Sequence, residues 1–285
     1  MDAGDSFHRI SILEILDRSF SFYIDRIENF FPIFLLLNVA NIFLVYTARF
    51  VMPKFNPPYG SLNDLLIWLI NYGSFTAAIL SILFLATWII TNIGNSMVIG
   101  YALDVFEGRR ASIRESITLI SHLLWKVLAI SLITGILIAL GFLLLILPGI
   151  IIMVIFSLSI PALIYEQTSV FSSLRRSKEL TNNRWWRVFL LLLAIFIIFA
   201  VIYLLIEVLT IPFNQINQHF LIKEIIRVII ISLIEPIYPV NMAYLYYYLR
   251  EQKIYPPREV KFCYICGQIL PYDAIYCPNC GRRIS

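Results

Sequence analysis

Long apolar segments constrain the fold of this chain more than any other feature of its sequence. A helix needs about 20 apolar residues to cross a bilayer. Segments of that order recur at Phe31–Phe50, Phe75–Ile99, Val127–Ile146, Gly149–Tyr165, Val188–Ile211 and Ile225–Tyr248. With 60% hydrophobic and only 14% charged residues, the chain lies outside the composition of ordinary soluble domains. We therefore expect an all-α polytopic membrane protein with about six transmembrane helices in a lipid bilayer.

A proline and a glycine divide the longest apolar block, which runs from Leu128 to Tyr165 and is too long for one spanning helix. Proline lacks a backbone donor and glycine permits a tight turn. Leu147-Pro148-Gly149 therefore predicts a hairpin between the third and fourth spans. The fourth span is close to the lower limit of about 17 residues for a crossing helix.

Basic residues are distributed unevenly between the two sides of the predicted bundle. An even number of spans places both termini on one side. Of the 22 Lys and Arg, all but four lie in the N-terminal stretch, the second and fourth loops or the C-terminal tail. The exceptions are Arg49, Lys54, Lys223 and Arg227. Because Lys and Arg concentrate on the cytoplasmic side, we expect a multi-pass protein of the cell (plasma) membrane with both termini in the cytoplasm. The net charge of +4 follows from this topology and does not indicate nucleic-acid binding.

Three short amphipathic stretches precede the first, third and fifth spans, and each opens with a serine and a β-branched residue. They begin at Ser11, Ser112 and Ser169. In the first stretch, apolar side chains such as Leu13 and Phe20 recur with the helical period. The pattern predicts cytosolic interfacial helices that lie in the headgroup plane. The membrane domain would then consist of three units, each an interfacial helix followed by a transmembrane hairpin. The alternative is that any linker beside a membrane looks amphipathic.

All four cysteines of the chain fall in its last 23 residues, as two C-x-x-C pairs. The pairs are Cys263 and Cys266, then Cys277 and Cys280. Each pair places two sulfurs on one turn, and the glycine after each pair lets the backbone turn tightly beneath a metal. A segment this short cannot bury a useful core, so a metal must supply most of its folding energy. Two disulfides in a secreted tail are the alternative, but paired C-x-x-C motifs are typical of zinc. We expect one structural Zn²⁺ held by four thiolates.

The segment from Phe262 to Ile284 resembles the short zinc-ribbon module of many archaeal and bacterial membrane proteins, in both pairs, both glycines and Pro278. The resemblance implies a structural metal, a small β module and three regions: a membrane helical domain (1–249), a linker (250–261) and the zinc ribbon (262–285). Arg282 and Arg283 make only a weak phosphate patch. We therefore expect the ribbon to bind a protein, or the cytosolic face of its own bundle, rather than nucleic acid.

Few ionisable residues lie within the predicted spans. Glu207 and Arg227 lie at similar depth in adjoining antiparallel spans, which predicts a mainly structural ion pair. Glu235 lies about 18 Å inside the sixth span, where an ionised group costs at least about 2.5 kcal/mol. Two interpretations are open: a proton or cation site, or a protonated carboxyl hydrogen-bonded to Asn41 or to a carbonyl freed by Pro236.

Several motifs between Ala102 and Leu193 carry a second resemblance. They are Asp104-Val-Phe-Glu-Gly108-Arg109-Arg110, Leu147-Pro148-Gly149, Ser159-x-Pro161-Ala162-Leu163, Ser173-Leu174-Arg175-Arg176-Ser177-x-Glu179-Leu180-Thr181 and Trp186-Arg187-Val188, with Glu14-Ile-Leu-Asp17-Arg18-Ser-Phe near the start. These motifs resemble the membrane domain of glycerophosphodiester phosphodiesterases. In those enzymes the domain is joined to a soluble catalytic barrel, which takes about 250 residues. No segment outside the predicted spans is long enough to form that barrel, so the resemblance implies a stand-alone membrane protein without the activity.

Three functions are compatible with these patterns. The first is a non-catalytic membrane protein that anchors or scaffolds, with the ribbon as its interaction module. The second is a small-solute or ion transporter that uses Glu235, and the third is the membrane subunit of an enzyme acting on lipid headgroups. The first is favoured because the specific chemistry in the sequence is a structural metal site. We therefore do not expect an enzyme.

Overall fold

The structure, a computed structural model, describes residues 11–52, 61–182, 184–214, 220–254, 260–263, 265, 266, 268–271 and 275–283. Within these ranges the chain forms helices followed by a short two-stranded sheet. The elements are α1 (Ile12–Ile24), α2 (Ile27–Val51), α3 (Leu62–Phe106), α4 (Ile113–Leu144), α5 (Ile146–Phe156), α6 (Ser159–Glu166), α7 (Val170–Thr181), α8 (Trp185–Asn214), α9 (Phe220–Ile234), α10 (Ile237–Ile254), β1 (Val260–Phe262) and β2 (Ile269–Pro271).

Six helical stretches of the described chain are long and apolar enough to cross a membrane, which confirms the predicted fold class. They are Ile27–Val51, Leu62–Phe106, Ile113–Leu144, Ile146–Glu166, Trp185–Thr210 and Lys223–Gln252. Two of them are broken within their length, between α5 and α6 and between α9 and α10. The fold is therefore an all-helical bundle whose longest elements match membrane spans by length and composition.

The second span is much longer than the expected Phe75–Ile99, because α3 begins at Leu62. Ser61 and Asp64 form a capping box there: the side chain of Ser61 accepts from the backbone of Asp64, and Asp64 accepts from the backbone of Ser61. Such a box satisfies backbone donors that a helix start leaves unpaired. The 45-residue helix is about 67 Å long at 1.5 Å per residue, more than twice a hydrocarbon core of about 30 Å.

The predicted hairpin between the third and fourth spans is present, but its break lies before Pro148. The chain leaves the helical conformation at Leu145 (φ −165°, ψ 157°), and α5 starts at the next residue. Pro148 then occupies the first turn of α5, where a missing backbone donor costs nothing. Below the turn the two helices touch through glycines, since a Cβ on Gly141 would stand 2.8 Å from the Cα of Gly149.

Each of the three expected amphipathic stretches begins a helix at its serine. Ser11 and Ser169 cap α1 and α7 by accepting from backbone N–H groups three residues on. Ser112 precedes α4, whose first part runs directly into the third span instead of forming a separate helix. In α1 the face that packs inward carries Ile15 and Phe22, whereas Leu13 and Phe20 of the predicted apolar face stay exposed. The expected membrane-surface position of that face remains a prediction.

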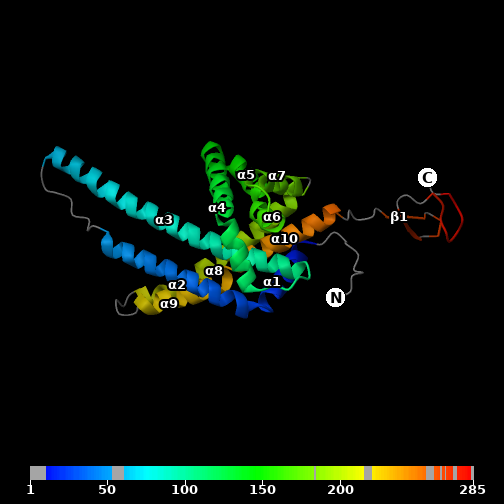
Figure 1. The fold of residues 1–285 in the computed structure, drawn as a ribbon, viewed down its shortest axis with the longest axis horizontal. Helices are drawn as coiled ribbons and strands as arrows, with labels where there is room; N and C mark the ends of the chain where they lie inside the picture. The colour runs from blue at the N-terminus through cyan, green and yellow to red at the C-terminus, as the bar shows by residue number, and fades with distance from the viewer. Residues whose placement is uncertain are drawn as a thin grey trace.

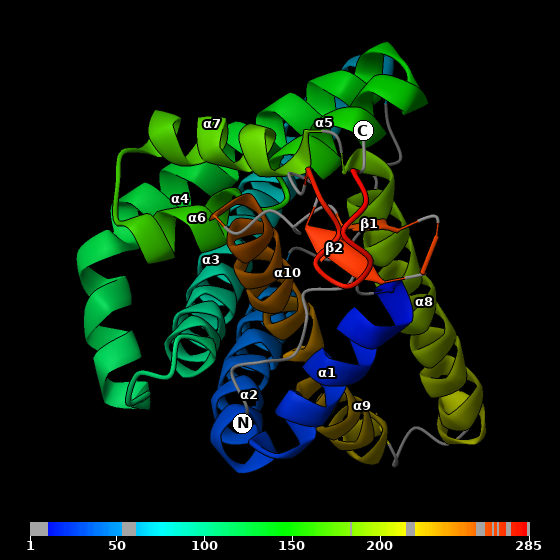
Figure 2. The same cartoon turned by 90° about the vertical axis from the view of Figure 1, so that its right-hand side faces the viewer.

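Helix α10 lies at the centre of the bundle, against α1, α3, α6 and α7. Its side chains from Val240 to Leu249 are almost all buried, and Tyr246 is fully enclosed. Figure 1 shows the end of α2 and the starts of α3 and α9 at one end of the molecule, with α1 and the end of α10 toward the other. In Figure 1 α4 stands steeply across α3, so the apolar helices do not all run parallel, and Figure 2 shows α10 in the middle of the bundle.

A serine from α7 holds the break between α5 and α6. The Oγ of Ser177 donates to the carbonyl of Ile155 at 2.6 Å and accepts from the backbone N–H of Leu158 at 3.2 Å. These bonds satisfy groups that the break removes from the helical pattern, which is necessary because a buried unpaired backbone group is costly. The short helices α6 and α7 are thereby fixed beside the end of α10.

Candidate metal centre and polar sites of the helical domain

The four cysteines lie on two turns with matching backbone geometry. Cys263 directly follows β1, which pairs antiparallel with β2 through Phe262 and Ile269. The N–H of Cys263 donates to the carbonyl of Gln268 at 2.9 Å, and the N–H of Cys277 donates to the carbonyl of Arg282 at 2.8 Å. Each turn thus folds back over five residues and presents two sulfurs on one side.

The second turn depends on the glycine that follows it. Gly281 has φ of +68°, and its N–H donates to the carbonyl of Cys277 at 2.8 Å. This left-handed conformation favours glycine because other residues carry a Cβ that clashes there. The corresponding Gly267 of the first turn lies outside the described residues.

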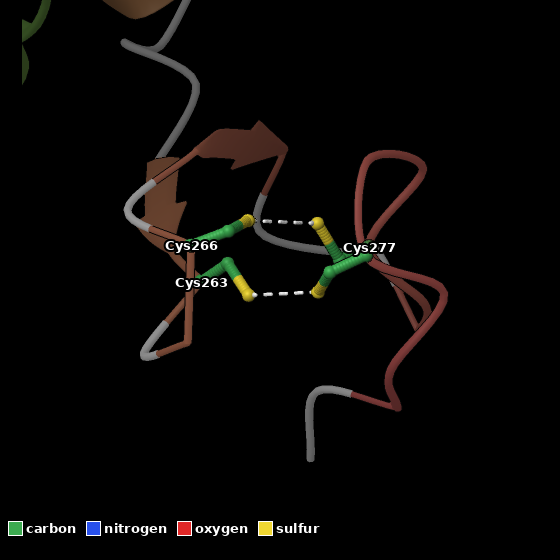
Figure 3. Close-up of side chains that lie close together, drawn as sticks. Cys263, Cys266 and Cys277 are labelled. Carbon is green, nitrogen blue, oxygen red and sulfur yellow. Dashed lines mark hydrogen bonds between the residues drawn. The ribbon is translucent and has the colours of Figure 1, made fainter.

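The four sulfurs converge on one point. The Sγ atoms of Cys263 and Cys280 are 3.5 Å apart, those of Cys266 and Cys277 are 3.6 Å apart, and all four lie within 4.8 Å of one another (Figure 3). Four thiolates around Zn²⁺ at about 2.3 Å have their sulfurs about 3.8 Å apart. These separations are too long for disulfide bonds of about 2.05 Å. The cluster therefore has the size and ligands of a tetrahedral metal site and is not a pair of disulfides.

Backbone donors favour the charged form of two of these thiols. The N–H groups of Cys266 and Ile265 lower the pKa of Cys263 to about 6. Burial raises the pKa of Cys277, but donors from Cys280 and Asn279 outweigh it and the net shift is downward. Metals bind the thiolate, so lowered pKa values prepare the site for a cation.

The fourth thiol behaves differently because thiolates this close repel one another. The N–H of Arg282 lowers the pKa of Cys280, but burial and the sulfurs of the other three cysteines raise it to about 11. A divalent cation between the sulfurs removes this repulsion. Among the described His, Cys, Asp and Glu residues, these four cysteines form the group close enough to hold a metal. The shell is closed by four protein ligands, as in structural rather than catalytic sites.

The predicted ion pair between Glu207 and Arg227 is confirmed. The Nη2 of Arg227 donates to the carboxylate of Glu207, joining α8 to α9. A second carboxylate, Glu224 on the same helix, lies 4.0 Å from Arg227. The arginine is thereby neutralised within the bundle.

Glu235 has a different partner from the one expected. It lies in the turn between α9 and α10, where Pro236 interrupts the helix, and its Oε2 accepts from the Nδ2 of Asn38 at 2.9 Å. Asn38 also donates to the Oγ of Ser232 at 3.2 Å. Asn41, the expected partner, lies about one turn further along α2 and makes no hydrogen bond to Glu235 among those the structure describes. Residues three apart share a helix face, so the sequence indicated the correct face but not the correct amide.

An interaction network that the sequence did not reveal surrounds Arg250. This residue was assigned to the linker, but α10 continues to Ile254 and carries it into the bundle. The Nη2 of Arg250 donates to Glu107 at the end of α3 and to Glu251 at 2.8 Å, and its Cζ lies 4.0 Å from the ring centre of Tyr165. The sequence offers one signal for this network: an aromatic residue followed by a glutamate ends both α3 and α6, as Phe106-Glu107 and Tyr165-Glu166.

A similar pair holds α6 to α7 and α10. Glu166 accepts from Arg176 at 2.7 Å and from the hydroxyl of Tyr246 at 3.0 Å. These bonds lie at the ends of the spans and tie short and long helices together. Their partners are far apart in sequence, so periodicity alone does not reveal them.

One family matches most of the helical domain. A family model described as a domain of unknown function (DUF7847) matches residues 63–237. Searches of curated proteins and of solved structures found no match. The resemblance to the membrane domain of glycerophosphodiester phosphodiesterases stays a prediction based on the motifs quoted above.

Proposed function

The chain belongs to the DUF7847 family of unknown function, and we propose that it is a non-catalytic integral membrane anchor whose zinc ribbon docks a protein in the cytosol. The observation that carries the proposal is a closed cluster of four cysteine sulfurs that follows, in the sequence, a helical domain with six apolar stretches. A closed thiolate shell has no open position for substrate. The module therefore supplies a folded surface rather than chemistry.

The choice of zinc follows from the ligands. Four thiolates at tetrahedral spacing suit Zn²⁺ or an iron–sulfur site. Two C-x-x-C turns of equal geometry, each followed by glycine, are typical of a zinc ribbon. In a reducing cytosol the thiols stay free to bind the metal.

The charge distribution supports a cytosolic location for both termini. Of the four basic residues expected on the outer side, Arg49 lies near the end of α2 and Lys223 near the start of α9, two ends that share one side of the molecule in Figure 1. Arg227 lies midway along α9, and Lys54 lies outside the described residues. The other basic residues lie in or next to α1, in the α3–α4 connection and the first half of α4, in α7 and around the start of α8, and from the end of α10 onward. An asymmetry of this kind sets orientation through the positive-inside rule.

The surface of the ribbon favours a protein partner. Ile265 and Ile275 are 48% and 58% exposed, and Tyr276 beside them is exposed as well. Exposed apolar side chains on so small a module suit a protein contact. Only Arg282 and Arg283 are basic among the described residues after β1, which is far from the basic stripe of a nucleic-acid binder.

Photo-crosslinking in native membranes tests the proposal. A photoreactive amino acid at Ile275 in the full chain should crosslink to protein. The crosslink should disappear when Cys277 and Cys280 become serine, while the variant still inserts into the membrane. The same probe at the exposed Arg175 of α7 is the matched control, and its crosslinks should not depend on the cysteines. Crosslinks from Ile275 to nucleic acid, or protein crosslinks that survive loss of the cysteines, would contradict the proposal.

A further inference from the structure

Helices α2 and α9 lie side by side (Figure 1), and an apolar groove with a volume of about 560 Å³ runs along their contact. Val39 and Phe43 of α2 and Ile225 and Ile229 of α9 line it, and all four are exposed. The volume lies within the range of about 300–1,000 Å³ that is typical of small-molecule sites. Because both helices belong to predicted spans, the apolar group that meets this groove in a bilayer is a lipid acyl chain.

The groove is about as long as one lipid leaflet is thick. On α2 it reaches from Leu35 to Tyr46, which are eleven residues or about 16 Å apart along the helix. Half of a hydrocarbon core of about 30 Å is about 15 Å. Tyr46 lies near the end of α2 and Glu224 near the start of α9, so one end of the groove is polar and lies at the end of two spans. An acyl chain in the groove therefore has its headgroup end at Tyr46.

A smaller cavity of about 210 Å³ adjoins this polar end, and its lining carries a net positive charge. Tyr46 and Glu224 line both cavities. The smaller one adds Arg49 and Arg227 against the single carboxylate of Glu224. Its volume corresponds to about seven waters at about 30 Å³ each, which is enough for a phosphate group. An anion is the ligand that this charge favours.

Arg49 is the cation in this lining that remains available to an anion. Arg227 is held by Glu207 of α8 and lies 4.0 Å from Glu224. Arg49 forms no ion pair within the part of the chain that the structure describes, and its Cζ lies 5.8 Å from the ring centre of Tyr46. A guanidinium group binds phosphate oxygens through paired N–H donors.

The depth of Arg49 agrees with a headgroup site. It lies three residues beyond Tyr46 on the same helix face and two before the end of α2. Deeper in the same cavity, the amide of Asn38 already donates to Ser232 and Glu235. The donors available to a phosphate are therefore at the end of the span, where lipid headgroups lie.

We propose that the groove between α2 and α9 holds one anionic phospholipid, with an acyl chain along the apolar groove and its phosphate beside Arg49. The groove calls for an apolar part as long as a leaflet, and the adjoining cavity calls for an anionic group at its end. A zwitterionic phospholipid brings the same phosphate but also its own ammonium group, which competes with the arginine. Binding changes no covalent bond. The site does not depend on the ribbon or its partner and goes beyond the anchoring role.

Native mass spectrometry of the full chain, released from detergent micelles, tests the proposal. The probes are phosphatidylglycerol and phosphatidylcholine with identical acyl chains, added in equal amounts. One retained lipid per chain is expected. The affinity for phosphatidylglycerol should be at least about fivefold higher, since one basic residue near a membrane surface favours anionic lipid by about that factor.

Two variants separate the headgroup site from the groove. Arg49→Gln should lower the affinity for phosphatidylglycerol to that for phosphatidylcholine and leave phosphatidylcholine unchanged. Val39→Trp places a large ring in the groove and should weaken both lipids about tenfold, the effect of excluding about two methylene groups. Arg175→Gln on α7 and Ile136→Trp on α4 are the matched controls, because both side chains are exposed and neither lines the groove. Both controls should retain lipid like the unmodified chain.

Several results would overturn the proposal. They are equal retention of the two lipids by the unmodified chain, a preference that survives Arg49→Gln, and unchanged lipid retention in Val39→Trp. A lipid-free dimer that dissociates on Val39→Trp would show that a second copy of the chain fills the groove instead. If Val39→Trp does not fold, Arg49→Gln decides, because Arg49 is exposed and its loss breaks no described ion pair.

Discussion

Replacing Arg250 by alanine should destabilise the helical domain more than the same replacement of any surface arginine. The side chain of Arg250 is only 8% exposed and contacts Glu107, Glu251 and the ring of Tyr165. Its removal leaves two glutamates of low exposure without their cation. Breaking a buried pair in this way costs about 3–5 kcal/mol, and we expect about 3 kcal/mol because both carboxylates keep some contact with water. For a domain of this size that corresponds to a fall in Tm of roughly 6–12 °C.

The matched control is Arg175→Ala on α7. Arg175 also pairs with a glutamate, Glu179 at 3.3 Å, but its side chain is 84% exposed. Exposed pairs contribute about 0–1 kcal/mol, so its Tm should change by no more than about 4 °C. Glu107→Gln should fall between the two, since Glu251 still neutralises Arg250. Thermal unfolding of the purified full chain, followed by circular dichroism, measures all three. An Arg250→Ala variant no less stable than Arg175→Ala would refute the assignment of Arg250 to a buried network.

Three further outcomes follow from the geometry. Gly141→Ala should lower the free energy of unfolding by about 1–3 kcal/mol through overpacking, because the new Cβ meets the backbone of α5. Gly135→Ala, where the new Cβ has no neighbour within 4 Å, should be neutral or stabilising in the same unfolding assay. Metal affinity in a chelator assay should fall more steeply as pH drops below about 6, the pKa of the metal-free Cys263 thiol, because protons then also compete with the metal for that sulfur; an affinity that does not fall between pH 7 and pH 5 would contradict this sign. Single cysteines at Ser61 and Leu145, in a chain whose native cysteines are replaced, should react with a membrane-impermeant reagent from outside the cell; labelling of either only from the cytoplasmic side would contradict the six-span topology.

The membrane spans and the cysteine cluster were predictable because each has a local cause. A spanning helix needs about 20 apolar residues at any position in the chain. Each C-x-x-C pair forms its turn from its own residues. The ends of the elements were less predictable. Pro148 marks a helix break in sequence, yet it is accepted in the first turn of α5 and the break falls at Leu145. The start of α3 at Leu62 depends on the helix cap at Ser61, and a cap is not visible in the periodicity of apolar residues.

Side-chain partners across the bundle required the fold. Glu207 and Arg227 were paired correctly because two adjacent helices joined by a short connection fix their depth. Glu235 bonds to Asn38 rather than Asn41 because the choice between two amides one turn apart depends on helix rotation. Arg250 was assigned to the linker because charged residues after an apolar span usually mark its end.

The metal content of the intact protein tests the central claim most directly. Native mass spectrometry of the full chain, together with elemental analysis, should find one Zn²⁺ per chain. The metal should be lost when the buried Cys263 and Cys277 are both replaced by serine, while the helical domain still inserts and unfolds at a similar temperature. A preparation with all four cysteines reduced and no bound metal, or one in which cysteines are paired as disulfides, would contradict the account.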